Sequence, residues 1–255
     1  MSELLVEKRG AAQWITINRQ ARRNAMNDNV VFGIMDALTI ADTDPEIRAV
    51  VLTGAGDRAF CAGADLSADL HEHDFSRPGV PFLRLVKQAR DLTLPLIARV
   101  NGHAVAGGLG FVGMCDLAVA ADHARFGIPE AKVGIFPLQV MAVVQRLIPA
   151  RKLYEMAMTG ELISAGEALD IGLVNYVVPA ADLDRKVEWL LDRLVDKSPG
   201  AIRRGKFALR RAESMTFDEA AAFMEAQSEL LALTEDATEG RQAFMEKRPP
   251  AWKGR

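Results

Sequence analysis

Cysteine is scarce in this chain of 255 residues, which contains only Cys61 and Cys115. Two thiols cannot form the disulfide framework that stabilises small secreted domains, and they fit a reducing compartment. We therefore expect a cytoplasmic protein without structural disulfides.

The chain also lacks a strong excess of charge and a long apolar run. A formal net charge of -3 gives neither a basic face for nucleic acid nor a polybasic membrane anchor. The longest apolar stretch, residues 133–144, is interrupted by Gly134 and Pro137 and is too short to span a bilayer. The first residues are acidic early and have no apolar core, so we expect no signal peptide. Nucleic acid and membranes are not expected partners.

Hydrophobic residues make up 49% of the chain, which is ample for the core of one large domain. β-Branched and alternating apolar runs predict strands, and the first two strands should pair with each other. The predicted strands are residues 4–9, 14–18, 48–53, 96–100, 117–121, 125–128 and 173–178. The result is an α/β fold class.

Helices alternate with these strands at first and dominate from residue 140 onward. They are predicted at residues 28–41, 81–91, 183–195 and 201–211, with capping boxes at residues 164–167 and 216–219. Pro199 and Gly200 should separate the last two helices, and the polar residues 69–79 should form a mobile surface loop. We divide the chain into a core at 1–198 and a helical region at 199–255 that packs on a neighbouring subunit.

One motif points to a dinucleotide site and is rejected. Residues 54–59 match the G-x-G-x-x-A fingerprint after a predicted strand. That motif needs a helix to start at once, so that the pyrophosphate lies on its N-terminus. Residues 60–64 form a poor helix start, because two apolar residues lead into another glycine. We interpret the motif as a turn.

Two glycine-bearing segments, FCAGADL at residues 60–66 and NGHAVAGGLG at residues 101–110, follow apolar strands. Gly107 and Gly108 should open a helix, whose free N–H groups and positive end favour a negative oxygen. Together the segments predict a two-donor oxyanion hole of the kind that stabilises a thioester enolate. The alternative is that the glycines only permit tight turns.

Two groups of titratable residues stand out, and we interpret them differently. Glu130 follows Pro129 at the end of a strand; a carboxylate in an apolar pocket has a raised proton affinity, which suits acid–base catalysis, although a solvated loop residue is the alternative. The run at residues 71–74, HEHD, lies in a polar loop with no further His or Cys cluster, so we predict no metal site there. It is a flexible segment that is able to supply an acid. His103 is expected to make a structural hydrogen bond.

Several motifs, in order along nearly the whole chain, resemble the enoyl-CoA hydratase/isomerase (crotonase) family. They are ITINRQARRNAMN, VVLTGAGDRAFCAGADL, ARVNGHAVAGG, CDLAVAADHARFGIPEAKVGIFP, MTGELISAGEALDIGLVNYVVP and AFMEKRPPAW. The resemblance implies a crotonase-like spiral of ββα units, a homotrimer or dimer of trimers, and acyl-CoA thioester substrates. It implies that the backbone N–H groups of Ala64 and Gly107 form the oxyanion hole and that Glu130 exchanges protons with the acyl chain.

The resemblance also implies where coenzyme A binds as part of the substrate, with no permanently bound cofactor. The implied residues are Arg23, Ala25, Ala62, Asp65 and Leu66, with Phe244 and Lys247 reaching CoA, often from a neighbouring subunit. A basic side chain such as Arg23 suits the CoA phosphates.

Departures from the family pattern concern the substrate pocket. Family hydratases carry a second catalytic Glu at the position of Gly110. Bulky Phe136 and Leu138 stand where hydratases have a glycine-rich stretch; they either reshape the acyl pocket or, as we favour, pack in the core.

A single acid/base suffices to move the double bond of an enoyl-CoA from carbon 3 to carbon 2. Adding water across the double bond needs both an acid and a base. We therefore favour isomerisation with Glu130 alone. The alternatives are an enoyl-CoA hydratase with an unusual second acid and an acyl-CoA-binding protein with little catalysis.

Overall fold

The computed structural model describes residues 2–65 and 80–255. The chain begins with β1 (Leu4–Arg9) and β2 (Ala12–Ile17), which pair antiparallel as predicted. Helix α1 (Asp28–Thr43) follows, and the side chain of Asn27 caps it by accepting the N–H of Val30 at 3.0 Å. No helix within the described residues is long and apolar enough to cross a membrane.

Two sheets organise the described residues. The larger has the order β1, β2, β3 (Ala49–Gly54), β5 (Leu96–Val100), β7 (Leu117–Ala121) and β10 (Tyr176–Val178). The smaller has the order β4 (Ala59–Cys61), β6 (His103–Val105), β8 (Arg125–Gly127) and β9 (Ile163–Ser164). Neighbouring strands are parallel except in the pairs β1–β2 and β8–β9.

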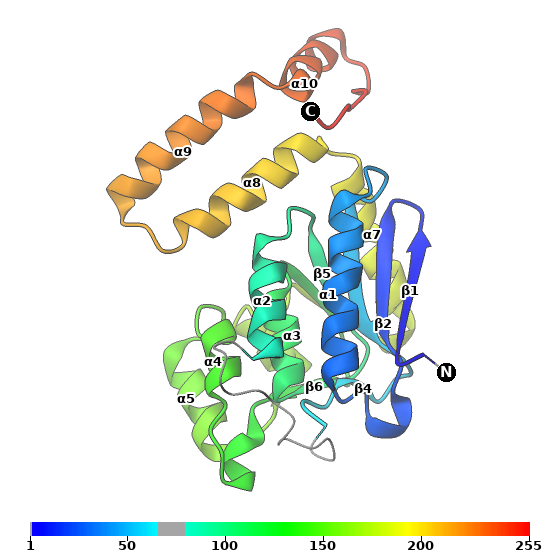
Figure 1. Cartoon of the computed structure of the whole chain (residues 1–255), viewed down its shortest axis with the longest axis vertical. Coiled ribbons are helices and arrows are strands. Elements are labelled where there is room, and N and C mark those ends of the chain that lie inside the picture. The colour runs from blue at the N-terminus through cyan, green and yellow to red at the C-terminus, as the bar shows by residue number, and fades with distance from the viewer. Residues whose placement is uncertain (1, 66–79) are drawn as a thin grey trace.

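One unit recurs along the first half of the chain. A strand of the larger sheet leads into a strand of the smaller sheet and then into a helix (Figure 1). The units are β3–β4–α2 (Pro81–Asp91), β5–β6–α3 (Gly107–Met114), and β7–β8 with a 3-10 helix (Pro129–Val133) and α4 (Leu138–Val144). Because β4, β6 and β8 are parallel neighbours, their carboxyl ends lie side by side, and the segments that follow them meet there.

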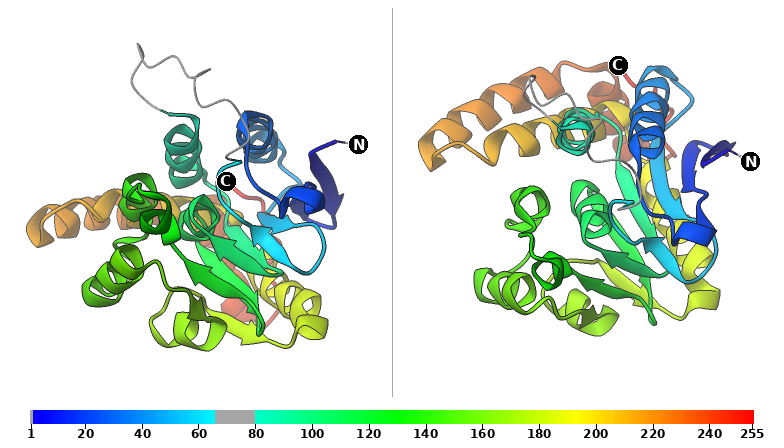
Figure 2. Two further views of the ribbon diagram at one scale, coloured as in Figure 1. Left: turned by 90° about the horizontal axis from the view of Figure 1, so that it is seen from below. Right: turned by 60° about the horizontal axis from the view of Figure 1, so that its bottom comes forward.

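The central strands β3, β5 and β7 of the larger sheet are buried on both faces, as their continuous apolar sequence requires. Val50 and Leu52 of β3 face the main core with α1, α2 and α3. Ala49 and Val51 point the other way and pack against α7 (Leu183–Val195), which covers the opposite face (Figure 2). This two-sided packing holds the carboxyl ends of the strands in fixed positions.

Five further α-helices lie in the described residues. They are α5 (Ala150–Thr159), α6 (Ala165–Asp170), α8 (Pro199–Ala212), α9 (Phe217–Ala232) and α10 (Glu235–Glu246). Asp116 fixes α8 to the core by pairing with Lys206 at 2.6 Å and Arg210 at 2.9 Å. Helix α9 projects beyond the sheets and buries none of its residues, so its packing against another subunit remains a prediction (Figure 1).

Most predicted elements are confirmed within two residues, including both capping boxes, but two predictions are wrong. The strand predicted at residues 173–178 is reduced to β10, because the N–H groups of Leu173 and Val174 donate to the carbonyl of Ala168 instead of to a neighbouring strand. Pro199 and Gly200 start α8 instead of preceding it. Proline has no N–H to lose at a first helical position, and Ser198 caps the helix by accepting the N–H of Ala201.

The turn predicted at residues 54–59 is confirmed, since these residues join β3 to β4 and no helix starts there. Two buried asparagines hold this turn. Asn24 donates to the carbonyls of Ala55 at 3.0 Å and Ala59 at 2.7 Å. Asn101 accepts the N–H of Gly54 at 3.0 Å and donates to the carbonyl of Gly56 at 2.8 Å. The side chains thereby replace a regular strand ladder.

Asn24→Ala should lower the free energy of unfolding by about 2–3 kcal/mol, because it removes the hydrogen bonds to the carbonyls of Ala55 and Ala59 and puts alanine at a φ of 55°. Chemical denaturation measures this. Asn29→Ala, at an exposed helix position, is the matched control and should change stability by less than about 0.5 kcal/mol. Equal effects of the two substitutions would contradict the role of Asn24.

Candidate active site

The first predicted oxyanion donor, Ala64, lies in a short parallel pairing with Met26, two residues before α1 begins. Met26 donates its N–H to the carbonyl of Gly63 and accepts the N–H of Asp65, both at 2.8 Å. In this pattern the N–H of the intervening residue points to the opposite side of the strand. The N–H of Ala64 therefore faces away from Met26, and the residue is exposed.

The second predicted donor, Gly107, is the first residue of α3, so its N–H has no partner within the helix. Ala106 precedes it with a φ of 53°, a conformation that alanine rarely adopts. The N–H of Ala106 donates to the carbonyl of Gly127 at 2.8 Å, which ties this strained residue to the end of β8. The helix thus starts abruptly at the carboxyl end of β6, with its positive end at the site.

The two glycine segments meet in space. A Cβ atom on Gly63 would lie 3.5 Å from the nitrogen of Gly107 and 2.8 Å from the Cβ of Ala106. A Cβ on Gly107 would overlap the Cε of Met26 and lie 3.8 Å from the Cα of Gly63. Only residues without side chains allow the backbones to approach this closely. The structure therefore brings the segments of both predicted donors together.

Glu130 lies in the 3-10 helix that follows β8, three residues after the carbonyl that holds Ala106. Its Oε2 atom is buried and accepts no hydrogen bond from the described residues. Burial raises the pKa of the carboxyl above its ordinary value, and a backbone hydrogen bond within Glu130 itself partly opposes this. A partly buried carboxyl with a raised pKa suits proton transfer near neutral pH.

Lys132 holds the Glu130 helix in place. Its stem packs on Gly160 at the end of α5, and its Nζ pairs with Glu161 at 2.7 Å. Gly134 then ends the 3-10 helix with a φ of 82°. Glu130 is thus presented by a short helix braced from a neighbouring element.

Gly110 lies one turn beyond Gly107 on the same side of α3. A Cβ at this position would be 2.5 Å from the Cζ of Phe82, so a side chain at residue 110 requires the ring to move. Phe82 belongs to the first turn of α2, is 9% exposed, and has its ring centroid 6.0 Å from that of Phe111. An aromatic ring therefore occupies the space beside Gly110.

The prediction that Phe136 and Leu138 pack in the core is wrong. They are 43% and 70% exposed. Val140 and Val144, four residues apart, form the buried stripe of α4, and Leu138 lies on the other side of that short helix. Contact of Phe136 and Leu138 with an acyl chain remains a prediction.

Four of the residues predicted to bind CoA lie near Ala64 in the structure. They are Arg23, Ala25, Ala62 and Asp65. The carbonyl of Arg23 accepts the N–H of Ala62 at 3.1 Å, which places Arg23 beside the AGAD segment, and Ala25 is buried next to it. The carboxylate of Asp65 pairs with Arg19 at 2.8 Å, and both side chains are nearly buried. This ion pair shapes the loop that carries Ala64.

Phe244 and Lys247 lie elsewhere. They are at the end of α10, far from β4 and β6 in Figure 1, and Phe244 is 85% exposed. Within one chain the structure does not bring them to the other site residues. Leu66 and the segment at residues 71–74 lie outside the described residues.

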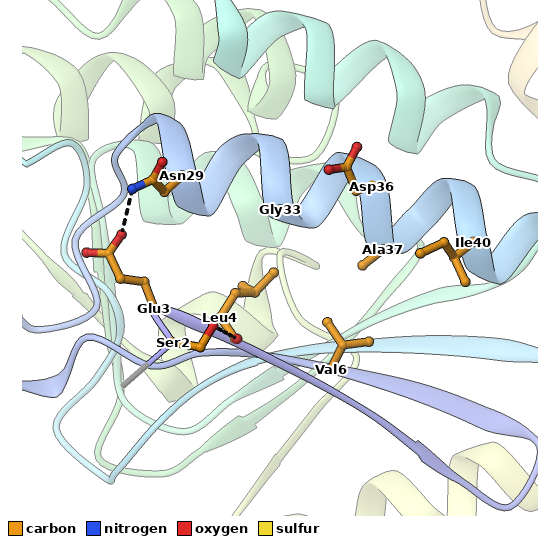
Figure 3. Close-up of a pocket in the computed structure, with 9 residues that line it drawn as sticks. All are labelled: Ser2, Glu3, Leu4, Val6, Asn29, Gly33, Asp36, Ala37 and Ile40. Atoms are coloured by element: carbon orange, nitrogen blue, oxygen red, sulfur yellow. Dashed lines mark hydrogen bonds between the residues drawn. The ribbon is translucent and has the colours of Figure 1, made fainter.

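A groove of about 480 Å³ between β1 and α1 is distinct from this site (Figure 3). It is lined by Ser2, Glu3, Leu4, Val6, Asn29, Gly33, Asp36, Ala37 and Ile40. None of the predicted catalytic residues belongs to it.

His103 makes the predicted structural hydrogen bond, in which its Nδ1 accepts the N–H of Arg125 at 3.2 Å.

Sequence reasoning missed Met26 and Phe82, the side chains that fill the space beside Gly107 and Gly110. Each lies close to the start of a helix, and nothing in its local sequence indicates that it contacts α3. The glycines at positions 107 and 110 were the only sequence signal that other side chains pack closely against α3.

Glu130→Gln should stabilise the fold in a pH-dependent way. Because the pKa of Glu130 is raised in the folded state, the stability contributed by its protonated form is lost as the pH rises through that value. The neutral glutamine avoids this loss. Thermal unfolding should show the variant more stable than the wild type at about pH 8, with the difference vanishing at about pH 4. A pH-independent difference would contradict burial as the cause.

Comparison with known proteins agrees with this geometry. The sequence model of the enoyl-CoA hydratase/isomerase family matches residues 7–255. An enoyl-CoA hydratase of Mycobacterium tuberculosis is 36% identical over 99% of this chain and 97% of its own length. The 2,3-dehydroadipyl-CoA hydratase of Escherichia coli is 36% identical over the full length of both chains.

The fold is matched as well. The crystal structure of an enoyl-CoA hydratase from Mycobacterium smegmatis superimposes with a TM-score of 0.92 at 33% identity, covering 98% of each chain. This confirms the predicted crotonase-like fold with its helical C-terminal region. The chain belongs to the enoyl-CoA hydratase/isomerase family.

Proposed function

We propose that this acyl-CoA enzyme converts a 3-enoyl-CoA into a 2-enoyl-CoA, with Glu130 as its single acid/base. One observation carries the proposal: α3 has glycine at position 110 and no acidic residue, and the ring of Phe82 takes the space beside Gly110, so α3 offers no second carboxylate next to the predicted oxyanion donors. An isomerase removes a proton from one carbon of the substrate and returns it to another, and a single carboxylate can do both.

In the proposed reaction, the thioester oxygen accepts the N–H groups of Ala64 and Gly107. The Glu130 carboxylate removes a proton from carbon 2 of a 3-enoyl-CoA, and the electrons move onto the thioester oxygen. The resulting dienolate takes the same proton back at carbon 4, which leaves the double bond between carbons 2 and 3. Each donor is worth about 3 kcal/mol of transition-state stabilisation, and the raised pKa of Glu130 lets it return the proton.

We propose further that Arg23, Ala25, Ala62, Asp65 and Leu66 bind the CoA portion. The exposed ends of Phe244 and Lys247 fit a contribution from a second copy of the chain in a homotrimer or dimer of trimers. No permanently bound cofactor is needed for this proton transfer. A cytoplasmic location stays a prediction.

Hydration is the second candidate, since the relatives reported above are named as hydratases. Adding water across the double bond requires a base for water and an acid for the α-carbon. With glycine at position 110, that second group must come from a different element. A protein that only binds acyl-CoA is the third candidate.

Purified protein given 3-hexenoyl-CoA should produce the conjugated 2-enoyl thioester, followed by its ultraviolet absorbance, and should leave 2-hexenoyl-CoA unhydrated. Glu130→Gln should reduce turnover by at least about 100-fold, while Glu155→Gln on the surface of α5 should have no effect. Rapid loss of the conjugated signal would favour the hydratase instead. Binding without turnover of either substrate would favour the third candidate.

A further inference from the structure

We propose that Phe82 is a specificity-determining residue, whose ring restricts the site to acyl groups that are unbranched at carbon 3. The proposal rests on the proposed function for the class of ligand and for the position of the thioester oxygen at the N–H of Gly107. It is independent of whether the enzyme isomerises or hydrates, because it concerns the space available beside the reacting carbons.

The depth of the ring supports this role. The thioester oxygen is assigned to the N–H of Gly107, and Gly110 is three residues further along the same side of α3, about 4.5 Å at the helical rise. The first carbons of an acyl chain span a similar length. The Cζ of Phe82 lies 2.5 Å from the position of a Cβ on Gly110, so the ring tip is at the level of those carbons.

The ring is held firmly at that place. Helix α2 is packed through fully buried Leu85 and Ala89, and Gln88 donates to the carbonyl of Met35 on α1 at 2.8 Å. Phe82 also stacks obliquely on Phe111, whose ring is fully buried. A bulky substituent on the acyl chain therefore meets the Phe82 ring, and displacing this ring costs free energy because packed interiors resist displacement.

The glycine at position 110 is the complement of the ring. Gly107 and Gly110 present a side of α3 without side chains, and Met26 and Phe82 fill the space beside them. Met26 supports the oxyanion segment at the helix start. Phe82 fills the space beside Gly110, one turn further along α3, where its ring limits the size of a substituent on carbon 3 of the acyl group.

The test compares the binding of butanoyl-CoA and 3-methylbutanoyl-CoA by calorimetry; both acyl groups are saturated, so the enzyme can neither isomerise nor hydrate them. With Phe82 present, the straight chain should bind about tenfold or more tightly than the branched one, the usual value of one methyl group in a rigid pocket. Phe82→Leu should reduce this ratio to near one while the straight chain keeps its affinity within a few-fold.

Phe207→Leu is the matched control, because it makes the same change in a separate ring pair, in which the centroid of Phe207 on α8 lies 6.3 Å from that of Phe223 on α9. It should leave the ratio unchanged. An unchanged ratio in Phe82→Leu, or an equal change in both variants, would overturn the proposal. Failure of the proposed isomerase activity is a separate result, since it appears only in the turnover assay of the wild type.

A stability measurement tests the geometry without any ligand. Gly110→Ala should lower the melting temperature of the wild type, because its Cβ displaces the Phe82 ring. In the Phe82→Leu background the same change should be neutral or stabilising, since alanine is the better helix former. Equal effects of Gly110→Ala in both backgrounds would also overturn the proposal.

Discussion

The backbone pairing of Met26 with Gly63 and Asp65 is the interaction on which the site depends. It turns the N–H of Ala64 away from α1 and seats the AGAD segment against the first residue of α3. Without that pairing the two glycine segments would be separate turns at the ends of separate strands. With it, the segments of the two predicted backbone donors, which are distant in the sequence, lie against each other.

Rigid features surround this pairing and explain its precision. The asparagine side chains hold the turn before β4, Arg19 fixes Asp65, and the strained Ala106 is tied to the end of β8. Local strain of this kind persists only where neighbouring structure determines it, and it is frequent at functional sites. Glu130 follows β8, the strand that also holds Ala106, so the proposed base and the segment of one proposed donor are attached to the same strand.

The sequence predicted the elements that have strong local signals. The buried strands, the capped helices and the glycine segments could be found because periodicity, caps and missing side chains are local properties. The smaller sheet was only partly predicted, because β4, β6 and β9 are two or three residues long and exist through pairing with distant strands. Met26 and Phe82 were missed for the same reason, and the exposure of Leu138 depends on which side of a short helix is buried.

The central claim is that the N–H groups of Ala64 and Gly107 polarise the thioester carbonyl. Infrared difference spectroscopy of butanoyl-CoA carrying ¹³C at the carbonyl, bound to Glu130→Gln, tests it most directly. Two backbone hydrogen bonds in a partly water-excluded site should move the carbonyl stretch to a lower frequency than in water. A stretch at the frequency of the free thioester in water would contradict the account.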